Sequence, residues 1–164
     1  MNLAYSIFVA IVWFLSTYFM VVFLLLLFTK KKQLFTSPDE NIGDLPAVSI
    51  LVPAYNEAET IADSIASLRK VDYPKDKLEI IIINDGSRDD TSKVVRSCLK
   101  KDDNIIFIDN KVNKGKAACL NQGIELSRGE FVATMDSDSE IAADIFRKTL
   151  PYFNNKKVGA VTVS

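Results

Sequence analysis

Two aspartates, Asp136 and Asp138, follow a short apolar run in the segment EFVATMDSDSE. Residues 131–135 have the length and composition of a buried strand, so both carboxylates are expected at its carboxyl end. In open parallel α/β sheets, ligands bind at that end of the strands. Carboxylate oxygens suit Mg²⁺ and Mn²⁺, and phosphate oxygens can complete the coordination shell. The pair therefore predicts a metal-bridged diphosphate site.

The Asp-Ser-Asp turn also has simpler interpretations. Asp and Ser often end strands and cap helices, so these three residues alone are compatible with an ordinary turn. A calcium-binding EF-hand loop is excluded, because Ile141 stands where that loop requires glycine and because a strand, not a helix, precedes it. Whether these three residues form only a turn or part of a binding site depends on the residues that follow the other strands.

Further apolar runs at 48–52, 78–83 and 105–108 are followed by residues suited to ligand binding. These residues are Pro53, Tyr55, Glu57, Asp85 and Lys116. Because the carboxyl ends of parallel strands share one edge of a sheet, we expect them to lie near the two aspartates. An acceptor for a uracil ring nitrogen, a flat tyrosine ring, a cation and a metal site together suit a nucleoside diphosphate.

The spacing of the apolar runs predicts the fold class. Together with a fifth run from Val158 to Val163, they recur at near-equal intervals, with a helical pattern between each pair. This alternation indicates βαβ units, and continuous apolar strands indicate a parallel sheet that is covered on both faces. The sequence predicts one α/β domain with a Rossmann-like, mostly parallel sheet over residues 47–164.

Caps and periodicity predict the helices between these strands. Asn56 is expected to cap the first helix, with Glu59 completing a capping box. Ser139 is expected to cap the last helix, which runs through Leu150. The helix after the third strand is predicted to end near Gly129. Its predicted inner face consists of Ala117, Leu120 and Ile124.

Composition excludes several classes of function. The 20 basic and 21 acidic residues nearly cancel, so no nucleic-acid partner is expected. The chain contains no histidine, which removes the commonest general base and the usual zinc ligand. Cys98 and Cys119 lack a CxxC partner and are expected to be free, buried thiols in a reducing compartment.

The first 29 residues carry no charged side chain and predict a transmembrane anchor. A helix from Leu3 to Phe28 would be roughly 39 Å long, more than the roughly 30 Å hydrocarbon core of a bilayer. The features of a cleaved signal peptide are missing. Lys30, Lys31 and Lys32 follow at once, so the positive-inside rule places this end in the cytoplasm. We expect a single-pass protein of the cell membrane, with its N-terminus outside, a linker over 30–46 and a cytoplasmic domain.

Two common nucleotide-binding motifs are missing. No GxGxxG follows the first strand, which argues against a dinucleotide site. Gly115 and Lys116 do not form a P-loop, because Asn110 replaces its first glycine and Ala117 replaces its Ser or Thr.

Three stretches together resemble the nucleotide-sugar half of a family-2 glycosyltransferase with the GT-A fold. They are VSILVPAYNEAETI, IIINDGSRDDT and NKGKAACLNQGIELSRGEFVATMDSDS. The resemblance covers about residues 47–164. Within that family, the sequence pattern resembles the processive membrane enzymes that make chitin, hyaluronan, cellulose and poly-N-acetylglucosamine.

The resemblance implies a role for each site residue. Pro53, Tyr55 and Glu57 would line the nucleoside pocket, Asp85 would accept a hydrogen bond from uracil, and Lys116 would lie near the nucleotide. Asp136 and Asp138 would form the catalytic DxD element, in which Asp138 ligates Mg²⁺ or Mn²⁺ and Asp136 contacts metal or ribose. The implied reaction transfers a sugar from UDP-GlcNAc or UDP-glucose, with inversion, to a polysaccharide or lipid acceptor.

The resemblance also leaves part of the family pattern unmatched. The family's general base, its Gln-x-x-Arg-Trp element and its further membrane helices would all follow Ser164. We therefore expect a donor-binding half, as a fragment, a truncated product or one piece of a split enzyme, that alone transfers little or no sugar. A second polypeptide would then supply the acceptor half. The alternatives are a non-catalytic, membrane-anchored nucleotide-binding subunit and a GDP-sugar:lipid-phosphate transferase.

Overall fold

The computed structural model describes residues 2–34, 44–101 and 104–163. The chain divides into two compact units, Met1–Pro38 and Asp39–Ser164, each of which is described by itself. Most of the linker predicted over 30–46 lies outside the described residues.

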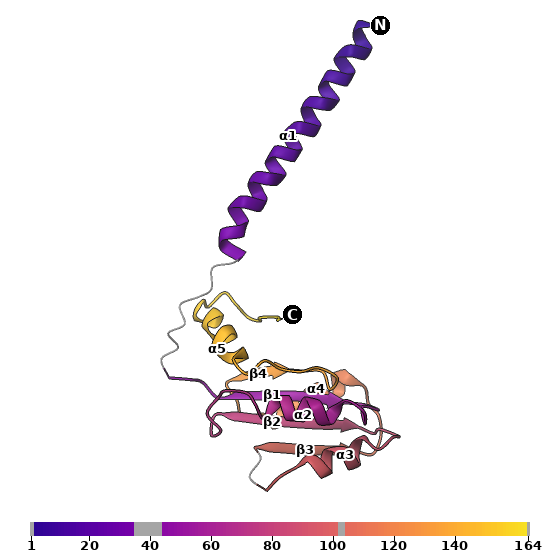
Figure 1. The fold of residues 1–164 in the computed structure, drawn as a ribbon, viewed down its shortest axis with the longest axis vertical. Helices are drawn as coiled ribbons and strands as arrows, with labels where there is room; N and C mark the ends of the chain where they lie inside the picture. The colour runs from indigo at the N-terminus through magenta and orange to yellow at the C-terminus, as the bar shows by residue number, and fades with distance from the viewer. Residues whose placement is uncertain (1, 35–43, 102–103, 164) are drawn as a thin grey trace. The chain divides into compact units, whose positions relative to one another are not determined.

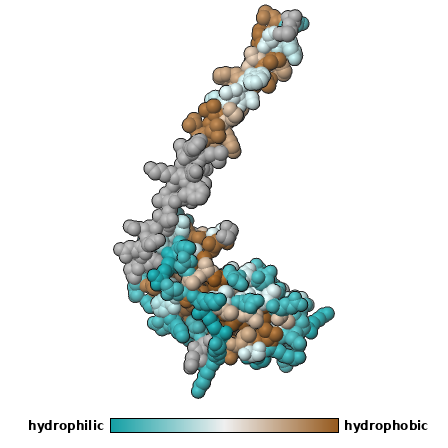
Figure 2. Space-filling model, viewed as in Figure 1, coloured by the Kyte–Doolittle hydropathy of each residue, from teal (hydrophilic) through white to brown (hydrophobic). Residues whose placement is uncertain are grey.

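The first unit contains the helix α1, Leu3–Leu34. Its segment Leu3–Leu26 has a mean hydropathy of 2.5 and is long and apolar enough to cross a membrane. Large apolar side chains such as Trp13, 72% exposed, and Phe14, 70% exposed, point away from any protein core. Brown, apolar residues recur along the segment Leu3–Leu26 (Figure 2), as in a helix whose surroundings are themselves apolar.

The second unit is built on a four-stranded parallel sheet (Figure 1). Its strands are β1 (Val48–Ala54), β2 (Leu78–Asp85), β3 (Ile105–Asn110) and β4 (Phe131–Thr134). Their spatial order is β3-β2-β1-β4. The predicted Rossmann-like, mostly parallel sheet is confirmed over these four strands.

Helices cover both faces of this sheet. The even-numbered residues of β1 and β2, among them Ile50 and Ile80, pack with α2 (Ile61–Leu68) and α3 (Thr91–Cys98). The odd-numbered residues Leu51, Ile81 and Ile83 pack with Cys119 of α4 (Lys116–Leu126). Strand side chains alternate between the two faces, so continuous apolar strands fill two cores at once, as predicted.

The predicted fifth strand is wrong. Residues 158–163 have no regular secondary structure and pair with none of the four strands. They follow a short helix α5 (Ile145–Thr149) and a 3₁₀ helix η1 (Leu150–Asn154). A strand needs a neighbour for its main-chain N–H and C=O groups. An apolar run such as this one, in which Val163 is 63% exposed, cannot form a strand without that partner.

The predicted helix caps are also wrong. The helix α2 begins at Ile61, with Thr60 at its N-cap and no capping side chain, whereas Asn56 lies in the loop before it with a φ of 58°. The helix α5 begins after Asp144 rather than at Ser139. Asn56 instead makes tertiary hydrogen bonds with Ser87 and Arg88. The hydroxyl of Ser139 bonds to the adjacent Asp138, so neither side chain caps a helix.

The inner face of α4 differs from the prediction. Leu120 packs against the core as predicted, whereas Ala117 and Ile124 are exposed. The buried residues of the helix are Cys119 and Gly123. A Cβ on Gly123 would lie 2.9 Å from Cδ2 of Leu51, so glycine lets the helix approach the sheet closely. The helix ends at Leu126, three residues before Gly129.

Candidate functional site

The carboxyl edge of the sheet holds a cavity of about 340 Å³, called here the strand-end cavity. All seven site residues predicted from the sequence line it. The complete lining is Pro53, Ala54, Tyr55, Glu57, Asp85, Asn113, Gly115, Lys116, Cys119, Asp136, Ser137 and Asp138. These residues lie at or after the carboxyl ends of the four strands. From β1 the chain first builds β2 and β3 on one side, and β4 is added later on the other side. Such a reversal of strand order is where open α/β sheets bind their ligands.

Asp85 is the most deeply buried carboxylate of the cavity, at 3% exposed. Its Oδ1 accepts a hydrogen bond from the N–H of Lys114 at 2.9 Å, and its Oδ2 accepts one from the N–H of Gly115 at 2.7 Å. Asp85 therefore fixes the loop that leads into α4. Together with the thiol of Cys119, these donors leave one of the roughly four lone-pair sites of the carboxylate for a further donor.

Glycine is required at two positions around Asp85. Gly115 has a φ of 88°, and Gly86 has a φ of 67°. A Cβ on Gly86 would lie 2.7 Å from the main-chain N of Asn113, which is closer than van der Waals contact allows. The loop after β2 thus packs directly against the loop after β3, which brings Asn113 and Gly115 to the cavity.

Lys116 and Asp136 meet at the mouth of the cavity. The Nζ of Lys116, the first residue of α4, lies 2.5 Å from the Oδ1 of Asp136. Both side chains remain well exposed, at 61% and 59%. Asp138 accepts only a long bond of 3.4 Å from the Oγ of Ser139. Among the described residues, Asp138 thus has no cationic partner and its carboxylate faces solvent.

The donor set of Asp136 and Asp138 fits a hard divalent cation. No group of three or more His, Cys, Asp or Glu side chains that could hold a metal occurs in the described part of the chain. Two exposed carboxylates give a partial coordination shell, which Mg²⁺ and Mn²⁺ complete with water and phosphate oxygens. The residues therefore suit a metal that arrives with a phosphorylated ligand.

Cys119 is a cavity residue that the sequence analysis assigned no role. It is 1% exposed, and burial, followed by its hydrogen bond to Asp85, raises the pKa of its thiol to about 11. At neutral pH the thiol is protonated and inert as a nucleophile. The sequence predicted that Cys119 is free and buried, as observed, and its position three residues after Lys116 was the available signal for its place in the cavity.

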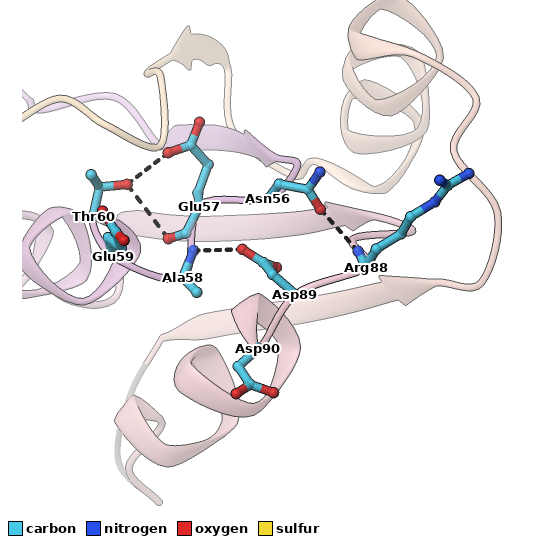
Figure 3. A pocket seen from close by; sticks show the side chains of 8 residues that line it. All are labelled: Asn56, Glu57, Ala58, Glu59, Thr60, Arg88, Asp89 and Asp90. Atoms are coloured by element: carbon cyan, nitrogen blue, oxygen red, sulfur yellow. Dashed lines mark hydrogen bonds between the residues drawn. The ribbon is translucent and has the colours of Figure 1, made fainter.

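A second cavity of about 570 Å³ lies beside the loop after β1 (Figure 3). Its lining is Asn56, Glu57, Ala58, Glu59, Thr60, Arg88, Asp89 and Asp90. Within it, the Oγ1 of Thr60 donates to the Oε2 of Glu57 at 2.7 Å. Glu57 lines both cavities. The hydrogen bond from Thr60, which lines the second cavity, therefore orients the carboxylate of Glu57.

These features define an α/β domain of the GT-A-like class, with its site at the carboxyl edge of a mostly parallel sheet. The sequence model of glycosyl transferase family 2 matches residues 49–164. The chain belongs to glycosyl transferase family 2.

Curated relatives refine this assignment. The chain is 36% identical over 152 residues to the poly-beta-1,6-N-acetyl-D-glucosamine synthase of Staphylococcus aureus (strain COL). The synthase of the same name from Staphylococcus epidermidis is 37% identical over 153 residues. Each alignment covers 91% of this chain, and the chain spans 36% of the length of these relatives.

Solved structures agree with the fold. The mannosyltransferase PcManGT from Pyrobaculum calidifontis, in complex with GDP-Man and Mn²⁺, matches 83% of this chain and 41% of its own chain. That match has a TM-score of 0.71 and 29% identity. S. aureus TarS 1-349 in complex with UDP-GlcNAc matches 72% of this chain and 37% of its own, with a TM-score of 0.59 and 25% identity.

Proposed function

We propose that this chain is the donor-binding part of a membrane-bound glycosyltransferase that takes a UDP-sugar together with Mg²⁺ or Mn²⁺. One observation carries the proposal: Asp85, Lys116, Asp136 and Asp138 converge with Tyr55 on one cavity at the carboxyl edge of the sheet. These residues come from four separate strand ends, so their convergence is a property of the fold.

The nucleoside end of the donor is assigned to the residues after β1 and β2. The ring of Tyr55 is 41% exposed and offers a flat surface for a base or ribose. Pro53 and Glu57 flank it along the cavity wall. Asp85 lies deepest, where its remaining lone-pair site can accept a hydrogen bond from a uracil ring nitrogen.

The diphosphate end is assigned to Lys116, Asp136 and Asp138. The two carboxylates would hold the cation, and Lys116 supplies a further positive charge at the same mouth of the cavity. When bound, the divalent cation supplies Lewis-acid stabilisation for the departing diphosphate. Asp136 and Asp138 are the catalytic residues that the described chain offers.

The nucleotide and acceptor are proposed from the relatives. The synthases of poly-beta-1,6-N-acetyl-D-glucosamine and the TarS complex with UDP-GlcNAc favour UDP-GlcNAc, with UDP-glucose as the related donor. A growing polysaccharide or a lipid-linked sugar is the proposed acceptor. The chain spans 36% of the length of those relatives. In the whole assembly, a second polypeptide would supply the acceptor half. Alternatively, this chain would be a non-catalytic nucleotide-binding subunit.

A GDP-sugar:lipid-phosphate transferase is the second candidate. The observation in its favour is the structural match to PcManGT, whose complex contains GDP-Man and Mn²⁺. The two candidates differ in the base that the cavity accepts, so a comparison of UDP with GDP separates them.

The membrane placement rests on α1. Its segment Leu3–Leu26 has the length and hydropathy of a spanning helix, and Lys30, Lys31 and Lys32 follow it in the sequence. We assign the lysines to the cytoplasmic side of the cell membrane, with the N-terminus outside. This places the donor site in the compartment where nucleotide sugars are made.

Ligand-dependent thermal stabilisation tests this function. The detergent-purified chain is melted with UDP or GDP, each with and without Mn²⁺, alongside Asp138→Ala. A ligand at 100 times its dissociation constant should stabilise the fold by about 2.7 kcal/mol. We expect stabilisation by UDP that needs Mn²⁺ and is lost in Asp138→Ala.

Asp76→Ala is the matched control, because it removes a carboxylate beside the amino ends of the strands. This variant should keep the full UDP response. Stabilisation by GDP alone would select the second candidate, and the absence of any nucleotide response would refute both.

A further inference from the structure

Two loops that border the strand-end cavity are joined through Asn56. The loop after β1 carries Tyr55 and Glu57, which line the cavity, while Asn56 between them does not. The loop after β2 begins with Gly86, directly after Asp85. Asn56 therefore lies between the residues assigned to the nucleoside without touching the cavity itself.

The backbone of Asn56 is held in the left-handed region, with a φ of 58°. It is the only non-glycine residue with positive φ in the described part of the chain. Asparagine tolerates this conformation better than most residues. The reversal of direction sends the side chains of Tyr55 and Glu57 to the cavity and that of Asn56 to the neighbouring loop.

Asn56 exchanges a reciprocal pair of hydrogen bonds with the loop after β2. Its N–H donates to the Oγ of Ser87 at 2.9 Å. Its Oδ1 accepts from the N–H of Arg88, also at 2.9 Å (Figure 3). Ser87 is fixed in turn, because its N–H and its hydroxyl both donate to the Oδ1 of Asn84 at the end of β2. The pair thus connects the first loop to the rigid end of a buried strand.

Two more main-chain groups after Asn56 are fixed by the same loop and by the first residue of α3. The N–H of Glu57 donates to the Oγ1 of Thr91 at 2.8 Å, and the N–H of Ala58 donates to the Oδ2 of Asp89 at 3.1 Å. Three successive N–H groups therefore find side-chain acceptors between the end of β2 and the first residue of α3. Only Asn56 also returns a bond from its own side chain.

We propose that Asn56 is a positioning residue for nucleotide binding. It fixes Tyr55 and Glu57 at a set distance from Asp85, so that the groups that contact the nucleoside are arranged before the ligand arrives. Preorganised contacts increase affinity because binding no longer has to order them. This inference rests on the proposed function, since it assumes that the strand-end cavity binds a nucleotide.

Two substitutions separate the backbone conformation from the hydrogen bonds. Asn56→Gly keeps the positive φ accessible and removes the carboxamide. Ser87→Ala removes the acceptor for the N–H of Asn56 from a residue that lines neither cavity. Ser87→Thr restores a hydroxyl without a change of charge. Asn155→Gly is the matched control, because its Oδ1 accepts a bond of 3.1 Å from the N–H of Lys157 in an exposed loop outside both cavities.

The readout is the dissociation constant of UDP with Mn²⁺, measured by calorimetry on the full chain well below its melting temperature. We expect Asn56→Gly and Ser87→Ala each to raise the dissociation constant about tenfold, the equivalent of one net hydrogen bond. Ser87→Thr should restore most of the affinity, and Asn155→Gly should leave it unchanged. Because both bonds join the same two loops, the double variant should bind only slightly more weakly than either single variant.

The outcomes distinguish this inference from the proposed function. If the unsubstituted chain binds no nucleotide, the proposed function fails. If it binds UDP and Asn56→Gly binds equally well, with only a lower melting temperature, Asn56 has a merely structural role and the positioning role is refuted. Equal weakening by Ser87→Thr and Ser87→Ala would refute it as well.

Discussion

Lys116 and Asp136 form an ion pair across the mouth of the strand-end cavity, with Nζ and Oδ1 2.5 Å apart. The same carboxylate is assigned to the divalent cation of the donor complex. A divalent cation at this carboxylate would lie beside the positively charged ammonium group of Lys116, and the two like charges repel each other. Binding of the metal should therefore release Lys116, which can then turn to the phosphates.

This exchange predicts opposite effects of Lys116→Met on two ligands. Without nucleotide, the variant should bind Mn²⁺ about twofold to fivefold more tightly, since exposed ion pairs contribute up to about 1 kcal/mol. With Mn²⁺ present, the variant should bind UDP more weakly, because a positive charge near the phosphates is lost. Both constants can be measured by calorimetry.

Lys148→Met provides the control for this experiment, because it breaks an equally exposed ion pair, with Asp144, outside the cavity. Its metal and nucleotide constants should match those of the unsubstituted chain. A Lys116→Met variant that loses affinity for both ligands would contradict the exchange.

Asp85→Asn should destabilise the domain. An amide has only one acceptor oxygen, so one of the two N–H groups of Lys114 and Gly115 loses its partner at a buried position. We expect a loss of about 1–3 kcal/mol in the free energy of unfolding, measured by urea titration with circular dichroism. Asp63→Asn, at an exposed position in the first turn of α2, should change this free energy by a few tenths of a kcal/mol. Equal stability of the two variants would show that Asp85 does not fix the loop.

Gly86→Ala should be far more harmful than Gly159→Ala. At Gly86 the added Cβ meets main-chain atoms of Val112 and Asn113 at 2.7 Å and the φ is 67°, whereas at Gly159 nothing lies within 4 Å. Strain and overpacking together predict a loss of about 2–4 kcal/mol for the first variant. The second should stay within about 0.5 kcal/mol of the unsubstituted chain. Thermal melting of the two variants measures this difference in stability. Similar melting temperatures would contradict the close approach of the two loops.

Cys119 predicts a specific loss of stability at alkaline pH. Burial raises the pKa of its thiol from 9.0 to about 11, so between these values the folded chain retains a proton that the unfolded chain has released. Stability contributed by the neutral thiol is therefore complete below pH 9 and declines as the pH rises toward 11. Cys119→Ala should show a shallower decline than the unsubstituted chain over this range. Parallel unfolding curves for the two proteins would contradict the raised pKa.

The strand ends were predictable from the sequence because they depend on local composition. The apolar run before Asp136 and the turn after Asp85 identify the same edge of the sheet once the strands are parallel. Seven site residues could therefore be placed together before any geometry was known. Their individual functional roles remain predictions.

The loop contacts were not predictable because they join distant parts of the chain. Asn56 has the residue type of a helix cap, and only the position of Ser87 and Arg88 beside it shows that its bonds go elsewhere. The inner face of α4 was assigned incorrectly because Gly123 carries no apolar side chain that would reveal burial. The 158–163 run has a strand's composition, but strand formation depends on a neighbour that composition cannot supply.

The position of β4 in the sheet has a consequence for the order of folding. Val48 pairs with Leu78 in β2 and also with Phe131 in β4, which lies much further along the chain. Closing the longer loop has the greater entropic cost, so β1, β2 and β3 should associate before β4. Asp136 and Asp138 follow β4, and these two carboxylates, which we propose as metal ligands, should thus be the last part of the site to assemble as the chain emerges from the ribosome. A chain arrested before residue 131 should then contain a partly formed sheet that cannot respond to Mn²⁺.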